Sequence, residues 1–291
     1  MSLSLTFWGT RGSIPTPGSA TVRYGGNTPC VELRRGDGSF LILDAGTGIR
    51  ELGQALVERA GGAPIIADVL VSHAHWDHIQ GLPYFAPIFL AGSAVTLWSP
   101  PALTPQLDRA VREQMSPGVF PVVFGNTAGA FRIRALDGTF DGRGNRFVVR
   151  TMPVRHPGGS TAYRIIDADT PERILVYISD NELGDGRGYD VPRDWRDTLV
   201  AFTKGAAVLV HDAMYTTEEY QQHRGWGHSD DLDALELAID AEVGRLVLFH
   251  HNPERSDAEL DARVAALRSE VAQRGAAVDV LGAAEGLTLS V

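Results

Sequence analysis

The sequence lacks the features that mark secreted, disulfide-rich or membrane-spanning proteins. It holds one cysteine, Cys30, in 291 residues. A single cysteine excludes an intramolecular disulfide framework and a zinc site made of several thiolates. No apolar run approaches the ~20 residues that a membrane-spanning helix needs. The N-terminus also lacks a basic stretch followed by a long apolar one, so we expect no signal peptide. These absences predict a cytoplasmic protein that makes no use of a membrane.

Positive charge is scarce as well. Lysine and arginine together number 26, against 36 aspartates and glutamates, which leaves a formal net charge of -10. Most of such a surface would repel a long nucleic acid, so we expect no partner of that kind. A small anionic substrate remains compatible with this charge, because bound divalent metal ions reverse the local field.

Short strands and amphipathic helices alternate along the chain, and 44% of its residues are hydrophobic, enough for a large core. Strands are expected at 3–8, 30–33, 40–43, 65–71, 94–98, 131–136, 147–154, 162–166, 174–179, 207–210, 245–249, 278–281 and 287–291. Helices are expected at 104–115, near 194–202, and at three apolar stripes that begin with Leu52, Leu232 and Leu260. A capping box, Ser256 to Glu259, opens the last of these helices.

The order of these elements indicates the architecture. Strand-rich runs in both halves, with helices between and after them, predict an α/β protein of two packed sheets with helices outside, a four-layer αββα sandwich. No change of composition marks a linker, so residues 1–291 are expected to form a single domain. Segment 83–130 is a candidate lid or dimer-contact insert. Its aromatic residues Tyr84, Trp98, Phe120 and Phe124 could stack on a base, or only pack in the core.

One short stretch carries most of the chemistry. The apolar run 65–71 reads as a buried strand, and it is followed directly by four side chains that can bind metals: His73, His75, Asp77 and His78. Neutral imidazole is a common ligand of transition metals, and a carboxylate can bridge two cations. Three histidines and an aspartate are too many for one tetrahedral site that also keeps an open position. The stretch alone therefore predicts a metal site and leaves open whether one ion or two are held.

Further candidate ligands follow later strands. His156, His211, His250 and Asp180 each stand at or just after the end of a predicted strand. Strand ends of a layered α/β fold gather at one rim, where sites are usually built. Such a rim could hold two divalent metals. Adjacent residues of a strand point to opposite sides, so only one of His250 and His251 should be a ligand, and we favour His250.

At this point the motifs resemble a known family. His-x-His-x-Asp-His after a strand looks like the signature of the metallo-β-lactamase fold. "PVRHPGGSTAYRI" resembles the third-histidine strand of that superfamily, "VYISDN" its bridging-aspartate strand, and "LVLFHHNPERSD" its last histidine segment. "FWGTRGS", "LILDAGTGIRELG", "VHDAMYT" and "GHSD" are similar to motifs of its phosphodiesterase branch, which includes ribonuclease Z and cyclic-phosphate hydrolases. The resemblance covers nearly the whole chain and implies the four-layer αββα sandwich of the metallo-β-lactamase type.

The resemblance implies two divalent metal ions, each held by three side chains and both bridged by one carboxylate. The first metal would be held by His73, His75 and His156. The second would be held by Asp77, His78 and His250, and the bridge would be Asp180. A hydroxide bridging the two metals would be the nucleophile, and Asp77 could orient it. Ligands of this type fit zinc, which we expect, and are also compatible with Mn, Fe or Ni.

Two further residues resemble catalytic groups of the phosphodiesterase branch. His228 resembles the histidine that faces the scissile phosphate and protonates the leaving oxygen. Asp212 stands where relatives often carry glutamate, and could orient an imidazole. The plain alternative for His228 is a helix-start residue before Ser229. We expect His211 only to order its loop, and His223 to be solvated.

Three classes of function compete: a phosphodiesterase acting on small or cyclic phosphodiesters, another hydrolase acting on thioesters, lactones or β-lactams, and a metal-binding protein without hydrolysis, such as an oxidoreductase. The motifs of His228 and Asp212 favour the first. Relatives that grip tRNA carry a long arm between the third histidine and the bridging aspartate, whereas Asp180 follows His156 by only 24 positions. We therefore predict a small substrate such as a cyclic nucleotide, with an RNA-processing nuclease of ribonuclease Z type as the alternative. A homodimer is suggested by analogy only.

Overall fold

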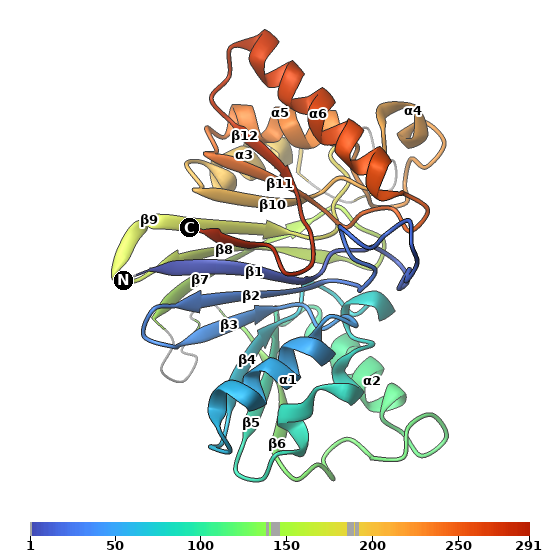
Figure 1. Cartoon of the computed structure of the whole chain (residues 1–291), viewed down its shortest axis with the longest axis vertical. Helices are drawn as coiled ribbons and strands as arrows, with labels where there is room; N and C mark the ends of the chain where they lie inside the picture. Colours follow the sequence, from blue (N-terminus) through green and yellow to red (C-terminus); the bar gives the residue numbers. More distant parts are fainter. Residues whose placement is uncertain (1, 138–139, 141–145, 185–188, 190–191) are drawn as a thin grey trace.

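A computed structural model describes residues 2–137, 140, 146–184, 189 and 192–291. Two sheets face each other in the middle of the molecule, with helices on both outer sides (Figure 1). This is the four-layer α/β sandwich that the sequence predicts. None of the helices among the described residues combines the length and the apolarity needed to cross a bilayer.

The first sheet has seven strands. In spatial order they are β13 (Thr288–Ser290), β1 (Leu3–Gly9), β2 (Cys30–Arg35), β3 (Phe40–Leu43), β4 (Ile66–Leu70), β5 (Ala94–Ser99) and β6 (Ala130–Ala135). The second sheet has six strands. In spatial order they are β12 (Asp279–Gly282), β11 (Arg245–Phe249), β10 (Val208–Asp212), β9 (Thr170–Ile178), β8 (Ser160–Asp167) and β7 (Phe147–Val154).

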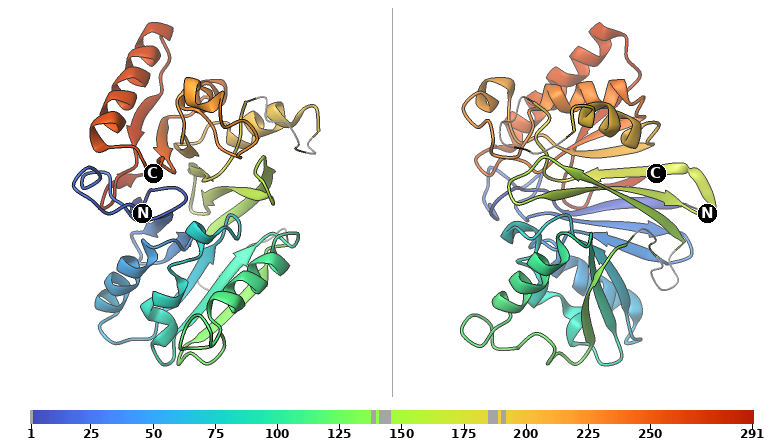
Figure 2. Two further views of the ribbon diagram at one scale, coloured as in Figure 1. Left: turned by 90° about the vertical axis from the view of Figure 1, so that its right-hand side faces the viewer. Right: turned by 180° about the vertical axis from the view of Figure 1, so that it is seen from behind.

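The helices lie on the outer faces of the sheets (Figure 2). The first sheet is covered by α1 (Ile49–Ala60), α2 (Thr104–Gln114) and the 3₁₀ turns η1 (Trp76–His78), η2 (Leu82–Tyr84) and η3 (Ala86–Phe89). The second is covered by α3 (Trp195–Thr203), α5 (Asp231–Asp240) and α6 (Asp257–Arg274). A short helix, α4 (Thr217–Tyr220), lies in the loop between β10 and α5.

The main core lies between the two sheets. Alternate residues of β1, Leu3, Leu5 and Phe7, are buried there, as the period of a strand requires. The ring of Phe7 lies 6.0 Å from that of Phe249 in β11, so the two sheets meet through aromatic contacts. Burial of this apolar surface is the dominant stabilising contribution that brings the sheets together.

Strand direction determines where the site lies. Strands β3 to β6 of the first sheet are parallel, and so are β9 to β12 of the second. β7 runs in the same direction as β9, because both are antiparallel to β8, which lies between them. The carboxyl ends of β4, β7, β9, β10 and β11 therefore gather at one rim, as predicted.

The expected elements differ from the observed ones in detail. The capping box of α6 is present, with Ser256 and Glu259 bonded reciprocally. Leu232, expected on the inner stripe of α5, is 36% exposed, because the inward face is formed by Ala234, Leu235 and Ala238 instead. Within segment 83–130, β5 and α2 belong to the sheet and its outer layer, so only 116–129 is irregular enough for an insert. The lid or dimer role of that segment, and the single domain over 1–291, stay predictions.

Candidate metal centre

The loop after β4 presents its polar side chains inward. The backbone N–H of Ser72 donates to Asp44 Oδ1 over 2.7 Å, which holds the start of the loop against the end of β3. The single 3₁₀ turn η1 then buries Asp77 and His78 and leaves Trp76 66% exposed. Local folding thus directs the ligand-type side chains toward the rim, where the other strand ends lie.

Among the described residues, five overlapping groups of three potential ligands lie at the rim, and two of them correspond to the predicted sets. The nitrogens of His73, His75 and His156 lie within 4.8 Å of one another. The ligand atoms of Asp77, His78 and His250 do the same. These are the two sets that the sequence predicts.

Asp180 lies between these two groups. One of its carboxylate oxygens is 3.1 Å from Nε2 of His78. The other is 3.4 Å from His250 Nε2 and 3.7 Å from His73 Nε2. A carboxylate that reaches members of both groups has the position that a bridging ligand requires.

Unsatisfied polar atoms show what this cluster is built to bind. His73 Nε2, His78 Nε2 and Asp180 Oδ1 are buried, and apart from the 3.1 Å contact between the last two they have no hydrogen-bond partner. Buried polar atoms without partners are costly. Lone pairs of histidine and aspartate that converge in this way are the donor set of a divalent transition metal. The residues present therefore fit the ions that the motif implies.

The protonation states of His73, His156 and Asp180 agree with this. His78 differs: burial lowers its pKa, but the charges of Asp180, Asp77 and Asp44 outweigh it and hold this pKa well above its usual value. Burial lowers the pKa of His73 well below its usual value and that of His156 to about 4, so both imidazoles keep a free lone pair. Burial opposes ionisation of Asp180, but His250, His78 and His73 hold its pKa well below the ordinary range. Neutral imidazole and ionised carboxylate are the forms that ligate metals.

Asp44, for which the motifs indicated no role, orients His78. Its carboxylate is fully buried at the end of β3 and accepts hydrogen bonds from the Ser72 hydroxyl at 2.9 Å and the Tyr177 hydroxyl at 2.8 Å. Asp44 Oδ2 also lies 2.9 Å from His78 Nδ1. This contact turns His78 Nε2 toward Asp77 and Asp180, the usual way in which a carboxylate orients a ligating histidine. Its place at a strand end was the signal that could have identified it.

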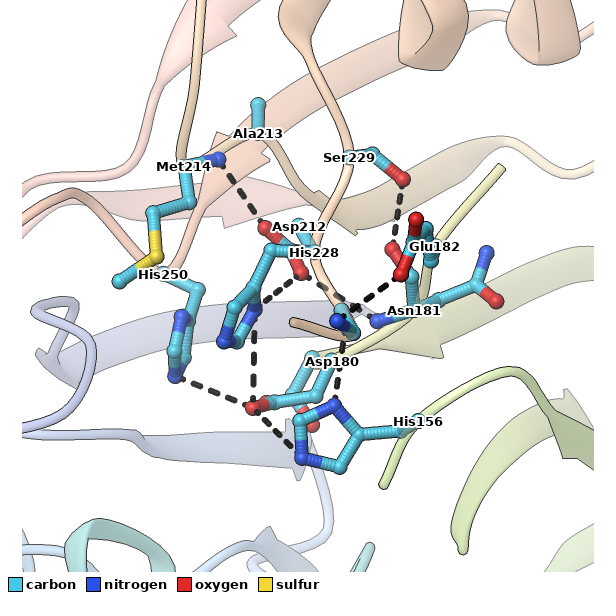
Figure 3. Close-up of polar contacts among 12 residues, drawn as sticks. His156, Asp180, Asn181, Glu182, Asp212, Ala213, Met214, His228, Ser229 and His250 are labelled. Carbon is cyan, nitrogen blue, oxygen red and sulfur yellow. Dashed lines mark hydrogen bonds and ion pairs between the residues drawn. The ribbon is translucent and has the colours of Figure 1, made fainter. Parts of the chain in front are cut away.

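His228 and Asp212 form a pair next to Asp180, whose carboxylate lies 3.9 Å from His228 Nδ1 (Figure 3). His228 Nδ1 is 2.7 Å from Asp212 Oδ2. Asp212 is fixed in turn by the backbone N–H of Met214 at 3.0 Å and of Asn181 at 3.2 Å. Burial lowers the pKa of His228, but the charge and hydrogen bond of Asp212 outweigh it and raise this pKa to about 9. The pair can therefore hold a proton at the rim at neutral pH.

A buried glutamate that no sequence motif indicated supports the loop before His228. Glu182 is fully buried, and its carboxylate accepts hydrogen bonds from the hydroxyls of Tyr220 at 2.7 Å and Tyr189 at 2.8 Å. It also accepts from the backbone N–H groups of Gly225 at 2.8 Å and Gly227 at 3.0 Å. One side chain thus anchors both ends of the turn 225–227.

Gly227 joins this turn to the metal-ligand cluster. Its carbonyl oxygen lies 2.9 Å from His156 Nδ1, which leaves His156 Nε2 to face His75 and Asp180. Its φ of 90° lies in the region that favours glycine, and an added Cβ would come 2.2 Å from His156 Nδ1. Only glycine fits this close approach. No sequence signal pointed to the contact, because its two partners are far apart in the chain.

Comparison with known proteins identifies the family. The family model described as a beta-lactamase superfamily domain matches residues 40–251. The chain belongs to the beta-lactamase superfamily. Ribonuclease Z of Haloferax volcanii is 27% identical over 289 residues, covering 86% of this chain and 84% of that protein. The resemblance drawn from the motifs is confirmed.

Solved structures of this superfamily share the fold. The metallo-beta-lactamase fold protein YhfI from Bacillus subtilis aligns over 100% of both chains, with a TM-score of 0.69 and 19% identity. A diphosphatase from the PhnP family aligns over 99% of this chain and 97% of its own, with a TM-score of 0.65 and 17% identity. Family and cluster together make this superfamily member a metal-dependent hydrolase with a site for divalent metal.

The remaining histidines of this superfamily member lie outside the two ligand groups. His251 Nε2 donates to the carbonyl of Ala283 at 2.8 Å, while its neighbour His250 faces Asp77. His211 Nδ1 bonds to the carbonyl of Asp212 at 2.6 Å, the local role expected of it. His223 was expected to be solvated. It is instead half-buried, because its ring stacks on Tyr215 at 4.6 Å.

Proposed function

We propose that this protein is a dinuclear, metal-dependent phosphodiesterase that acts on small or cyclic phosphodiesters, such as cyclic nucleotides. The observation that carries the proposal is the His228–Asp212 pair. It stands beside the candidate bridging Asp180 and shares no residue with the two proposed ligand sets, although its ligand-type atoms also lie within 4.8 Å of those of His156 and His250. Such a pair can supply a proton to a poor leaving group. Cleavage of a phosphodiester leaves an alkoxide, which does need a proton.

In this proposal the ligands are His73, His75 and His156 for one ion and Asp77, His78 and His250 for the other, with Asp180 shared. The bound cations, for which zinc is the first candidate, would supply Lewis-acid charge and a water of lowered pKa. Asp77 is held by the backbone N–H of Ser13 over 2.7 Å, which fixes the carboxylate that would orient the attacking water.

Proton donation is assigned to His228. With Nδ1 bonded to Asp212, its Nε2 proton is the one free to move to the leaving oxygen. Asp212 would hold the ring in place and stabilise the charged imidazole before the transfer. Such general acid catalysis typically contributes ~10²–10⁴-fold to the rate.

The small substrate is supported by the connection between His156 and Asp180. Residues 157–179 consist of β8, β9 and turns, so no extended arm leaves the body of the protein there. The net charge of -10 also opposes the binding of a long polyanion. The relatives named ribonuclease Z, at 23% to 27% identity, keep RNA processing as the second candidate. Cytoplasmic location and a homodimer remain predictions.

The test is a substrate panel assayed with added Zn or Mn: bis-p-nitrophenyl phosphate, cyclic nucleotides, a precursor tRNA, a β-lactam and a thioester. We expect turnover of the small phosphodiesters. Cleavage of precursor tRNA alone would replace the small substrate by the ribonuclease Z alternative. Turnover of the β-lactam or thioester without any phosphodiester would overturn the proposal as a whole.

The number of metals has its own test. Elemental analysis of the wild-type protein should find two divalent ions per chain. Asp180→Ala should reduce this to one or fewer, because both groups lose the carboxylate that they share. Two ions retained by Asp180→Ala would show that Asp180 is not a bridge.

A further inference from the structure

A pocket of about 310 Å³ opens beside His228. Its ten lining residues come from three separate segments of the chain: Ser13; Met214, Tyr215, Glu219, His223, Trp226 and His228; and Asn252, Pro253 and Glu254. His228 and Ser13 connect it to the metal centre, because the Ser13 N–H donates to Asp77 over 2.7 Å. The volume lies at the lower end of the range of ligand sites, about 300–1,000 Å³, and suits one small organic group.

One wall of this pocket is aromatic. The rings of Tyr215 and His223 are stacked, with centroids 4.6 Å apart and planes 13° from parallel. Trp226 meets His223 edge-on at 4.9 Å and is itself 61% exposed. A large ring left open to water next to a candidate active centre is a surface on which another flat ring can stack.

Most of the other lining residues are polar, and the protonated His228 ring is the positive charge among the ten. None of the ten lining residues is lysine or arginine. The Glu219 carboxylate accepts hydrogen bonds from the Arg255 guanidinium at 2.5 Å and from the backbone N–H of Thr216 at 2.8 Å. Asn252 and Glu254 belong to the same polar lining. Away from His228, this lining disfavours phosphate and offers acceptors to a flat, uncharged group that carries N–H donors.

We propose that this pocket binds the nucleobase of a nucleotide whose scissile phosphate lies at the metal centre, and that Trp226 is the residue on which the base stacks. The inference rests on the proposed function and deepens it by naming the part of the substrate that is recognised. A nucleobase next to the phosphate occurs both in a cyclic mononucleotide and at an RNA cleavage site. Both ligands would place the same base in the pocket, so only assays with each substrate can distinguish a cyclic mononucleotide from RNA.

The test compares two phosphodiesters with the same leaving group. Thymidine 5′-(p-nitrophenyl phosphate) carries a base, and methyl p-nitrophenyl phosphate does not. Trp226→Ala should raise KM for the thymidine ester about tenfold, as expected for loss of one base–aromatic stack, and leave the methyl ester unchanged. Trp226→Phe, which keeps a ring, should recover most of the difference. Running adenosine cyclic phosphates and a precursor tRNA in parallel identifies which nucleotide source depends on Trp226.

Tyr84 supplies the matched control. It is an exposed aromatic residue at 63%, it lies in η2 outside the pocket lining, and it tests whether a base stacks on segment 83–130 instead. Tyr84→Ala should leave both esters unchanged. If Tyr84→Ala loses the preference for the thymidine ester over the methyl ester and Trp226→Ala keeps it, the base does not bind in the pocket beside His228.

Binding separates this inference from the proposed function. Calorimetry with adenosine monophosphate should show weaker binding to Trp226→Ala than to the wild type, with circular dichroism confirming that the variant is folded. If the wild type hydrolyses both esters and Trp226→Ala changes neither KM, the pocket inference is wrong and the phosphodiesterase proposal stands. If no phosphodiester is hydrolysed, the proposed function fails. In that case the binding experiment still tests the pocket: if the wild type and Trp226→Ala bind adenosine monophosphate with equal affinity, the pocket inference is wrong as well.

Discussion

At the scale of single residues, the orientation of His78 depends on a carboxylate that touches no substrate. Asp44→Asn keeps the size of the side chain but removes the charge that faces His78 Nδ1 at 2.9 Å. We expect metal affinity to fall about 10- to 100-fold, the usual effect of losing such a partner. Competition with a chromogenic chelator measures this directly. The exposed Asp37, changed to Asn, is the control, and equal affinities of the two variants would contradict the role of Asp44.

The contribution of His228 to the rate of hydrolysis is expected to depend on the leaving group of the substrate. His228→Ala removes the proposed proton donor, so hydrolysis of an ester with an alkyl leaving group should slow by about 10²–10⁴-fold. A p-nitrophenyl ester needs little protonation, and its rate should fall far less. The ratio of the two rates is the measurement, alongside elemental analysis, in which the metal content should persist. Loss of metal from His228→Ala would instead make His228 a ligand.

The residues of the site were predictable to different degrees. His73, His156, Asp180 and His250 follow strands, and the rule that parallel strand ends share a rim predicts their proximity from the sequence alone. Glu182 obeys no such rule. Its partners are two tyrosine hydroxyls and two glycine N–H groups of other loops. Such contacts depend on loop paths, which residue periodicity does not encode.

At the scale of elements, the turn 225–227 between α4 and α5 should depend on Glu182. Glu182→Gln replaces two acceptor oxygens by one acceptor and one donor. At least one tyrosine hydroxyl or glycine N–H then loses its partner inside the protein. We expect a loss of about 1–3 kcal/mol of stability, measured by urea unfolding, and weaker activity, because Gly227 also contacts His156.

The control for this variant lies close by. Glu218 is exposed in α4, so Glu218→Gln changes the same chemical group without touching the turn. It should change neither stability nor activity. If Glu182→Gln behaves like Glu218→Gln in both assays, the turn does not need the buried carboxylate.

Elements themselves were predicted where their periodicity is long enough to read. β7 and β11 have the expected bounds, since alternating or continuous apolar runs define them. α4 was not predicted, because its four residues are too short for a helical stripe and depend on the capping box of Thr216 and Glu219. Leu232 was wrongly placed on the inner face of α5. The apolar residues of this helix are compatible with two orientations about its axis, and only its packing against β10 and β11 determines which one is adopted.

At the scale of the whole molecule, the two sheets and their shared rim follow from the order of strands and helices, but the pocket beside His228 does not. Its walls come from the loop after β1, the loop between β10 and α5, and the loop after β11. Nothing in the local sequence says that Ser13, Trp226 and Asn252 line one space. The sequence could therefore offer only the aromatic residues of 83–130 as a place for a base to stack, whereas the pocket that we propose lies in other loops.

Stability against acid is a property of the whole fold, because fully buried histidines, here His211 in β10 and His251 just after β11, contribute to it. Burial lowers the pKa of His251 to about 3 and that of His211 to about 4, whereas both should titrate near ~6.5 in the unfolded chain. Between these pKa values, both histidines are protonated in the unfolded chain and neutral in the folded protein. The stabilisation is complete above pH 6.5 and is lost as the pH falls from there toward 4 and then 3.

Within that pH range, each of these histidines should lower the free energy of unfolding by at most about 1.4 kcal/mol for each unit that the pH falls. Urea unfolding with a chelator present, at pH values between 7.5 and 4.5, measures the slope without a contribution from metal release. His251→Gln should have a slope smaller by about this amount, because one titrating group has been removed. Its absolute stability at pH 7.5 supplies the baseline, since neither protein takes up protons at that histidine there. Parallel slopes for the variant and the wild type below pH 6.5 would mean that His251 is protonated in the folded protein, and that its burial does not keep the ring neutral.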